Sequence, residues 1–113
     1  MALKVNEKQI HTAVIEHWRH TRVGGTLVAT IPNMRAFGQA GLTEGLPDLL
    51  VITPNLPVGF IELKATTGEL TEMQEQFGCI CQLHGIPWEV TYGREEPIAL
   101  LEKWGACMPR RVN

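Results

Sequence analysis

Two apolar runs separated by a short proline-rich link constrain the fold of this chain more than any other feature. The first run is DLLVIT at residues 48–53, and the second is GFIELKA at residues 59–65; PNLP lies between them. Their lengths and compositions predict two strands, and the short link predicts that these strands pair as an antiparallel hairpin. Asp48, the only aspartate of the chain, begins the first strand.

The rest of the chain alternates helices and strands around this hairpin. Apolar residues recur at steps of three and four in residues 6–21 and 71–84, which predicts two amphipathic helices. We expect further strands at residues 25–31 and 87–92, and a last helix at residues 96–105 followed by a tail. Because a helix connects the third and fourth strands, those two should be parallel. The order α-β-β-β-α-β-α predicts an α/β fold, a mixed four-stranded sheet flanked by helices.

The three cysteines of the chain predict neither a disulfide framework nor a zinc site. Cys79, Cys81 and Cys107 are odd in number and contain no CxxC pair, so we expect reduced thiols that pack in the core. The helix at residues 71–84 is expected to bury one face. The residues predicted on that face are Met73, Phe77, Ile80, Cys81 and His84.

Length and charge limit the class of protein. A chain of 113 residues suits a single domain, residues 1–113, and its start has no apolar segment as long as a signal-peptide core or a membrane span. We therefore expect a cytoplasmic protein. The net charge of −2 gives no general attraction to nucleic acid, so phosphate binding needs a local basic patch. The arginines available for one are Arg19, Arg22, Arg35, Arg94, Arg110 and Arg111.

Three charged residues of the hairpin should converge. Glu62 and Lys64 project from the same face of their strand, because strand side chains alternate. Counting back through the hairpin places Asp48 roughly opposite the segment from Glu62 to Lys64. Burying such groups unpaired costs several kcal/mol each, so the cluster should either neutralise itself or hold an ion. Two carboxylates suit Mg²⁺ or Mn²⁺, and a neighbouring lysine can orient or deprotonate a water molecule.

The ordered motifs resemble those of a nuclease family. GLPDLLV followed by FIELKA resembles the PD-(D/E)xK signature, and IPN at residues 31–33, EGLPDLLV and GFIELKATTGELTEMQ are together similar to its virus-type replication-repair nuclease (VRR-NUC) branch. The resemblance implies a restriction-endonuclease-like core and a Mg²⁺-dependent DNA endonuclease. It also implies a homodimer that acts on branched DNA such as four-way junctions. A phage-encoded enzyme working on DNA in a bacterial host would fit it.

The same resemblance assigns roles to individual residues. It implies that Asp48 and Glu62 bind the metal, with the main-chain oxygen of Leu63 as a further ligand, and that Lys64 positions or activates the attacking water. Glu7 matches an acidic residue that such enzymes often add to the metal site. Gln74 matches the motif glutamine, and the resemblance implies that it joins Asp48, Glu62 and Lys64 as a catalytic residue. Asn33 follows a proline, as it usually does in the family.

Each assignment has an ordinary structural alternative. Asp48 could be a turn residue after a proline, and Glu62 with Lys64 could form an exposed ion pair worth roughly 0–1 kcal/mol. Gln74 stands at the fourth position of the sequence TEMQ, a capping box in which its side chain would return to the N-cap backbone. Glu7 could be a first-turn charge that is favourable to the helix dipole.

Other functions also stay open at this point. A noncatalytic nucleic-acid-binding module on the same fold is the main alternative, and a structural or protein-interaction subunit is a third. Two-fold symmetry would supply two active sites for the two strands of a junction. Apolar residues suggested for the dimer interface are Leu27, Phe37, Leu42, Leu46 and Trp104.

Overall fold

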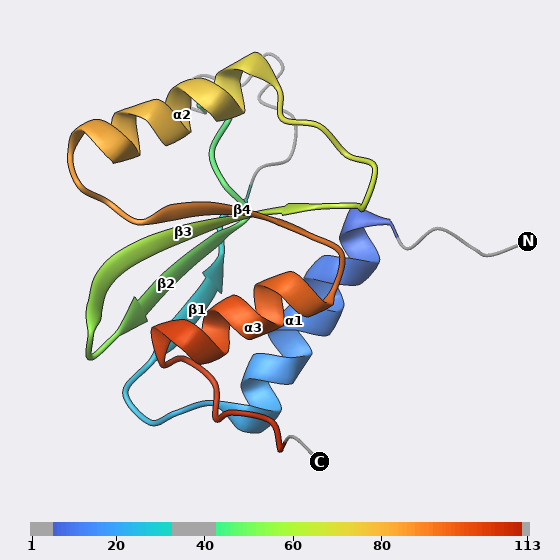
Figure 1. The fold of residues 1–113 in the computed structure, drawn as a ribbon, viewed down its shortest axis with the longest axis vertical. Helices are drawn as coiled ribbons and strands as arrows, with labels where there is room; N and C mark the ends of the chain where they lie inside the picture. The colour runs from blue at the N-terminus through green and yellow to red at the C-terminus, as the bar shows by residue number, and fades with distance from the viewer. Residues whose placement is uncertain (1–5, 33–42, 112–113) are drawn as a thin grey trace, which may run out of the picture.

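The computed structural model describes residues 6–32 and 43–111 of the chain. Three helices and four strands follow the predicted order (Figure 1). Their bounds are α1 Glu7–Thr21, β1 Leu27–Thr30, β2 Leu49–Thr53, β3 Leu56–Lys64, α2 Glu72–Leu83, β4 Trp88–Tyr92 and α3 Glu95–Trp104. Among the described helices none is long and apolar enough to cross a membrane.

The four strands form one mixed sheet in the order β1-β2-β3-β4. β1 with β2 and β2 with β3 are antiparallel, whereas β3 and β4 are parallel. The predicted fold class and both predicted pairing directions are therefore confirmed. A parallel pair needs a crossover connection, and α2 supplies it.

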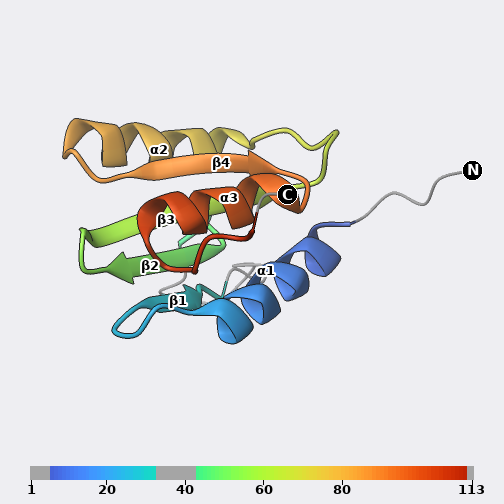
Figure 2. The same ribbon diagram turned by 60° about the horizontal axis from the view of Figure 1, so that its bottom comes forward.

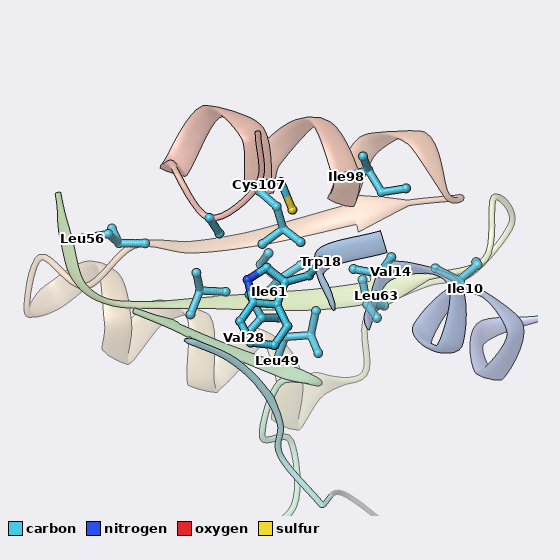
Figure 3. Packing of buried hydrophobic residues seen from close by; sticks show 13 residues of the cluster. Ile10, Val14, Trp18, Val28, Leu49, Leu56, Ile61, Leu63, Ile98 and Cys107 are labelled. Carbon is cyan, nitrogen blue, oxygen red and sulfur yellow. The ribbon is translucent and has the colours of Figure 1, made fainter. Parts of the chain in front are cut away.

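The helices cover the two faces of the sheet unequally. α1 and α3 lie side by side on one face, and α2 lies on the other face beside β4 (Figures 1 and 2). The main core lies under α1 and α3, where Trp18 packs with Val28, Leu49 and Ile61 (Figure 3). Glu62 and Lys64, which alternate with Ile61 and Leu63, project to the opposite face.

The hairpin turn lies closer to β2 than the sequence predicted. Pro54 and Asn55 form the turn, so β3 begins at Leu56 and not at residue 59. A register shift between Val51 and Thr53 absorbs the difference. Pro57 is tolerated within β3 because β4 pairs with β3 only from Phe60 onward.

The buried face of α2 is rotated from the prediction. Gly78 and Cys81 are its buried residues, whereas Ile80 is 55% exposed and His84 is also exposed. Gly78 sets this orientation, because a Cβ atom at that position would lie 2.5 Å from the indole ring of Trp88. A glycine carries no apolar signal in a periodicity count. The sequence pattern therefore placed Cys81 and the half-buried Phe77 correctly but missed Gly78, and it wrongly included Met73, Ile80 and His84.

The cysteines and the chain end also differ in part from expectation. All three cysteines are free, but only Cys81 and Cys107 are buried, and Cys79 is exposed on α2. The sequence predicted a tail after α3, but residues 107–108 of that segment are bonded to the end of α1. The backbones of Cys107 and Arg22 form an isolated antiparallel β-bridge, and the Met108 N–H donates a hydrogen bond to the Thr21 carbonyl over 2.8 Å. This contact ties the C-terminal segment to the end of α1.

Candidate active site

Asp48 lies beside the middle of the charged segment of β3, as the hairpin predicted. Leu49 pairs with Ile61, which places Asp48 across from Glu62 at the point where β2 begins. One oxygen of Asp48, Oδ2, accepts a hydrogen bond of 2.7 Å from the Leu63 N–H. This carboxylate is therefore held against the edge of β3 and does not act as a simple turn residue. The Leu63 carbonyl faces the same side as its N–H, because both groups of one strand residue serve the same neighbour.

Glu62 is buried in this cluster with only one of its oxygens satisfied. Its side chain is 2% exposed, Oε1 accepts a hydrogen bond of 2.9 Å from Gln74 Nε2, and Oε2 has no partner. Burial, then the Asp48 charge, and then a side-chain hydrogen bond between the protonated Glu62 and Asp48 raise the pKa of Glu62 from 4.5 to about 9, against the opposing effect of Lys64. Oε2 thus accepts no hydrogen bond, although the two carboxyl groups interact. The only other buried and unpaired side-chain atom of the described residues is His17 Nε2. An exposed ion pair is thus excluded for Glu62.

Gln74 caps α2 and also contacts Glu62, whereas its direct role in the reaction stays a prediction. The side-chain Oε1 of Gln74 accepts a hydrogen bond from the Thr71 N–H over 2.9 Å. The main-chain N–H of Gln74 donates to Thr71 Oγ1 over 3.2 Å, which completes the capping box of α2. Its Nε2 donates to Glu62 over 2.9 Å. An amide has both an acceptor and two donors, so one side chain caps the helix and orients a carboxylate.

Among the described residues, Lys64 and Glu7 are the other two charged residues near Asp48 and Glu62. Lys64 is 5% exposed, and no ion pair joins it to Asp48, Glu62 or Glu7. Glu7 is exposed in the first turn of α1, and its carboxylate contributes to the raised pKa of Glu62. A Cβ atom on Gly68 would lie 3.3 Å from both Glu7 Oε2 and Lys64 Cδ, so these two side chains flank the same point. Glycine at this position permits their close approach.

The donor set fits a hard divalent cation. Asp48 and Glu62 present oxygen ligands, and a cation would satisfy the buried Oε2 of Glu62 that lacks a partner. No group of three or more His, Cys, Asp or Glu side chains suited to a metal occurs in the described part of the chain. Glu7 therefore stands at the margin of an Asp48–Glu62 pair, and its role as a direct ligand stays a prediction.

A cleft beside Asp48 contains residues that sequence reasoning left out of the site. It has a volume of about 650 Å³ and lies between the first turns of α1 and the end of β1. His11 lines it one turn after Glu7, and its Nε2 lies 2.8 Å from Thr30 Oγ1. The four-residue spacing from Glu7 was the available signal, because it places both side chains on one face of the helix. Asn33, the other residue expected near here, lies outside the described residues.

The raised pKa of Glu62 predicts how stability depends on pH when no divalent ion is present. A carboxyl group with a folded-state pKa near 9 stabilises the fold fully below about pH 4.5, and this stabilisation is lost as the pH rises towards 9. We expect Glu62→Gln to be more heat-stable than the wild type at pH 8 in a chelator, by about 5 °C or more. The difference should shrink towards pH 5.

Thermal melts over this pH range test that prediction. Glu89→Gln is the matched control, because Glu89 is exposed and lies beside Ile61 in the parallel register. It should follow the wild type at every pH. A constant difference between Glu62→Gln and the wild type from pH 5 to pH 9 would contradict the buried, protonated state of Glu62.

Comparison with known proteins identifies relatives of this arrangement. A family model described as "VRR-NUC domain" matches residues 5–95. A solved structure titled "VRR_NUC domain protein" superposes with a TM-score of 0.75 at 20% identity, over 92% of this chain and 93% of that one. Another, titled "VRR_NUC domain", gives a TM-score of 0.61 at 23% identity, over 85% and 94% of the two chains. No curated protein matches the chain.

Proposed function

The chain belongs to the VRR-NUC domain family, and from this premise we propose that it is a metal-dependent DNA endonuclease that hydrolyses phosphodiester bonds. Branched DNA such as a four-way junction is the proposed substrate. Mg²⁺ is the proposed cofactor, and Mn²⁺ is expected to substitute for it. Solved relatives with the same nuclease-type fold support the family assignment at the level of architecture.

The observation that carries the proposal is the buried, unpaired oxygen of Glu62 beside Asp48. Keeping Glu62 ionised at this buried position next to Asp48 costs several kcal/mol, so without a cation the side chain is neutral, and a purely structural role does not explain two carboxyl groups placed together here. A noncatalytic module would have no need for Asp48, Glu62 and Lys64 together at one sheet edge. The cluster is the kind of site at which a strongly perturbed pKa indicates function.

The proposed reaction divides the work among the residues of the site. Asp48 and Glu62 would hold the divalent ion with the Leu63 carbonyl, and Glu7 would add negative charge at the margin. When bound, the ion supplies positive charge that stabilises the phosphate as negative charge develops on it. Lys64 orients the attacking water and adds a second fixed positive charge. Gln74 keeps Glu62 in place through its 2.9 Å hydrogen bond.

Cleavage of a labelled four-way junction and of a matched linear duplex tests this function directly. Turnover is expected with Mg²⁺ or Mn²⁺ and not in a chelator. Ca²⁺ should support DNA binding without turnover, because the larger ion gives poorer geometry for the attack. DNA binding with no cleavage under any of these ions would favour the noncatalytic module, and the absence of DNA binding would contradict both functions.

We propose further that the enzyme works as a two-fold dimer, so that two active sites face the two strands of a junction. Leu27 is 43% exposed and Ile52 is 37% exposed, and they lie directly opposite each other on the sheet face away from α1 and α3. Trp104 is a weaker interface residue than the sequence suggested, because it packs against the core. Leu46 is half-buried, and Phe37 and Leu42 lie outside the described residues.

Light scattering at micromolar concentration should give twice the chain mass of 12.6 kDa. Leu27→Lys is expected to shift the protein towards the monomer, because it places a charge in the apolar contact. Met108→Lys is the control, since Met108 is also exposed but follows α3. A wild-type monomer that still makes paired incisions would contradict the dimer.

A further inference from the structure

Not all of the arginines considered for phosphate contacts are free to make them. Arg110 is occupied by Glu95 at 2.6 Å and by Glu102 at 3.1 Å. Arg22 stacks over Trp18 with its guanidinium carbon 4.8 Å from the ring centroid. Arg35 lies outside the described residues. Arg19, Arg94 and Arg111 are exposed and make no ion pair or hydrogen bond with the described residues. Of these three, Arg94 lines a groove beside the site.

Arg94 lines a groove between α1 and the start of α3, which we name the α1–α3 groove. Its volume is about 680 Å³, and Lys8, His17, His20 and Arg94 line it, with Glu16 as the one carboxylate among its described lining residues. Lys8 is also exposed and forms no ion pair with a described residue. Two unpaired cations against one carboxylate give this groove a net positive charge on a protein of net charge −2.

The groove adjoins the candidate active site. The Gly93 N–H donates to the Lys64 carbonyl over 2.9 Å, so Arg94 directly follows a residue that is bonded to the site strand. On the other side of α1, Lys8 and Thr12 also line the cleft that contains Asp48. The groove and the cleft therefore flank the first turns of α1 and share these two residues.

We propose that the α1–α3 groove binds the phosphate backbone of the DNA substrate outside the reacting phosphate, with Lys8 and Arg94 as its principal contacts. This proposal rests on the proposed nuclease function. A flexible polyanion that passes over Asp48 and Glu62 can continue from the cleft into the groove on either side of Lys8. Unpaired lysine and arginine side chains are the groups that neutralise DNA phosphates, and they do so without reading the base sequence.

The test is DNA binding by fluorescence anisotropy in Ca²⁺ at salt concentrations between about 50 and 200 mM. Arg94→Ala and Lys8→Ala are each expected to weaken binding about fivefold or more at the low end of this range. Each should also reduce the slope of log K against log salt by about 1, because one phosphate contact is lost. Glu16→Gln should act in the opposite direction and tighten binding, since it removes a negative charge from the groove.

Lys103→Ala is the matched control. It removes one positive charge from the last turn of α3, the opposite end of the helix that Arg94 precedes, and Lys103 lines a different hollow together with Glu89 and Glu96. Its affinity and salt slope should equal those of the wild type. If Arg94→Ala behaves like Lys103→Ala while the wild type binds and cuts DNA, the groove assignment is wrong and the nuclease function stands. If the wild type binds no DNA, the nuclease function itself fails.

Discussion

Asp48→Asn should lower cleavage by about 10³-fold or more while the fold stays intact. The substitution removes one of the two carboxylates proposed to hold the divalent ion, whose contribution to the transition state is several kcal/mol, and about 1.4 kcal/mol corresponds to each factor of ten in rate. The asparagine carbonyl can still accept the hydrogen bond that Leu63 donates over 2.7 Å. Loss of activity would therefore not reflect loss of the β2–β3 contact.

The same variant should be at least as heat-stable as the wild type in a chelator. The Asp48 charge helps to raise the pKa of Glu62, so removing it relieves repulsion between the two carboxylates. Single-turnover cleavage and a thermal melt of the same preparation give the two measurements. Glu89→Gln, an exposed carboxylate on β4, serves as the control for loss of one negative charge. Wild-type cleavage by Asp48→Asn would remove Asp48 from the metal site.

Lys64→Ala should retain metal-dependent DNA binding and lose turnover by about 10²-fold or more, the scale of removing one preorganised electrostatic group. Lys64 is 5% exposed and no ion pair neutralises it within the cluster, so its charge is available to the reacting phosphate and water. Lys64→Arg should not restore the rate. A planar guanidinium distributes its charge differently from an ammonium group and cannot occupy the same point beside Gly68.

The measurement that decides the role of Lys64 is a single-turnover rate at saturating enzyme and Mg²⁺. Saturation separates the chemical step from DNA binding. Lys103→Ala is the control, since it removes an equal charge from a lysine that lines a different hollow. A Lys64→Ala rate within a few-fold of the wild type would mean that Lys64 only balances the charge of the carboxylates.

The fold was largely predictable because its signals are local. The TEMQ capping box marked the start of α2, apolar periodicity marked α1, and the short PNLP link indicated an antiparallel hairpin. The same hairpin carried the prediction that Asp48 lies across from the charged segment of β3, and the register confirms that position. The start of β3 was placed at residue 59, three residues after its actual start at Leu56, because a register shift beside Thr53 leaves no mark in the sequence pattern.

The parts that failed depend on contacts between distant residues. The buried face of α2 follows from Gly78 against Trp88, a fit that becomes visible only when the helix and β4 are placed together. The cleft with His11 and Thr30 joins α1 to the end of β1, nineteen residues apart along the chain. Gln74 was left with two competing interpretations, and the structure shows the helix cap together with a hydrogen bond to Glu62, because an amide side chain can serve two partners at once. Its role in the reaction stays a prediction.

The hydrogen bonds of Gln74 to both Thr71 and Glu62 couple the first turn of α2 to the position of the Glu62 carboxyl group. Its hydrogen bonds join the Thr71 backbone to the Glu62 carboxylate, so a displacement of Glu62 strains the first turn of α2. Fraying of that turn would in the same way release Glu62 from its orientation. We therefore expect the hydrogen-exchange protection of the Thr71 and Gln74 backbone amides to change when Glu62 changes its position.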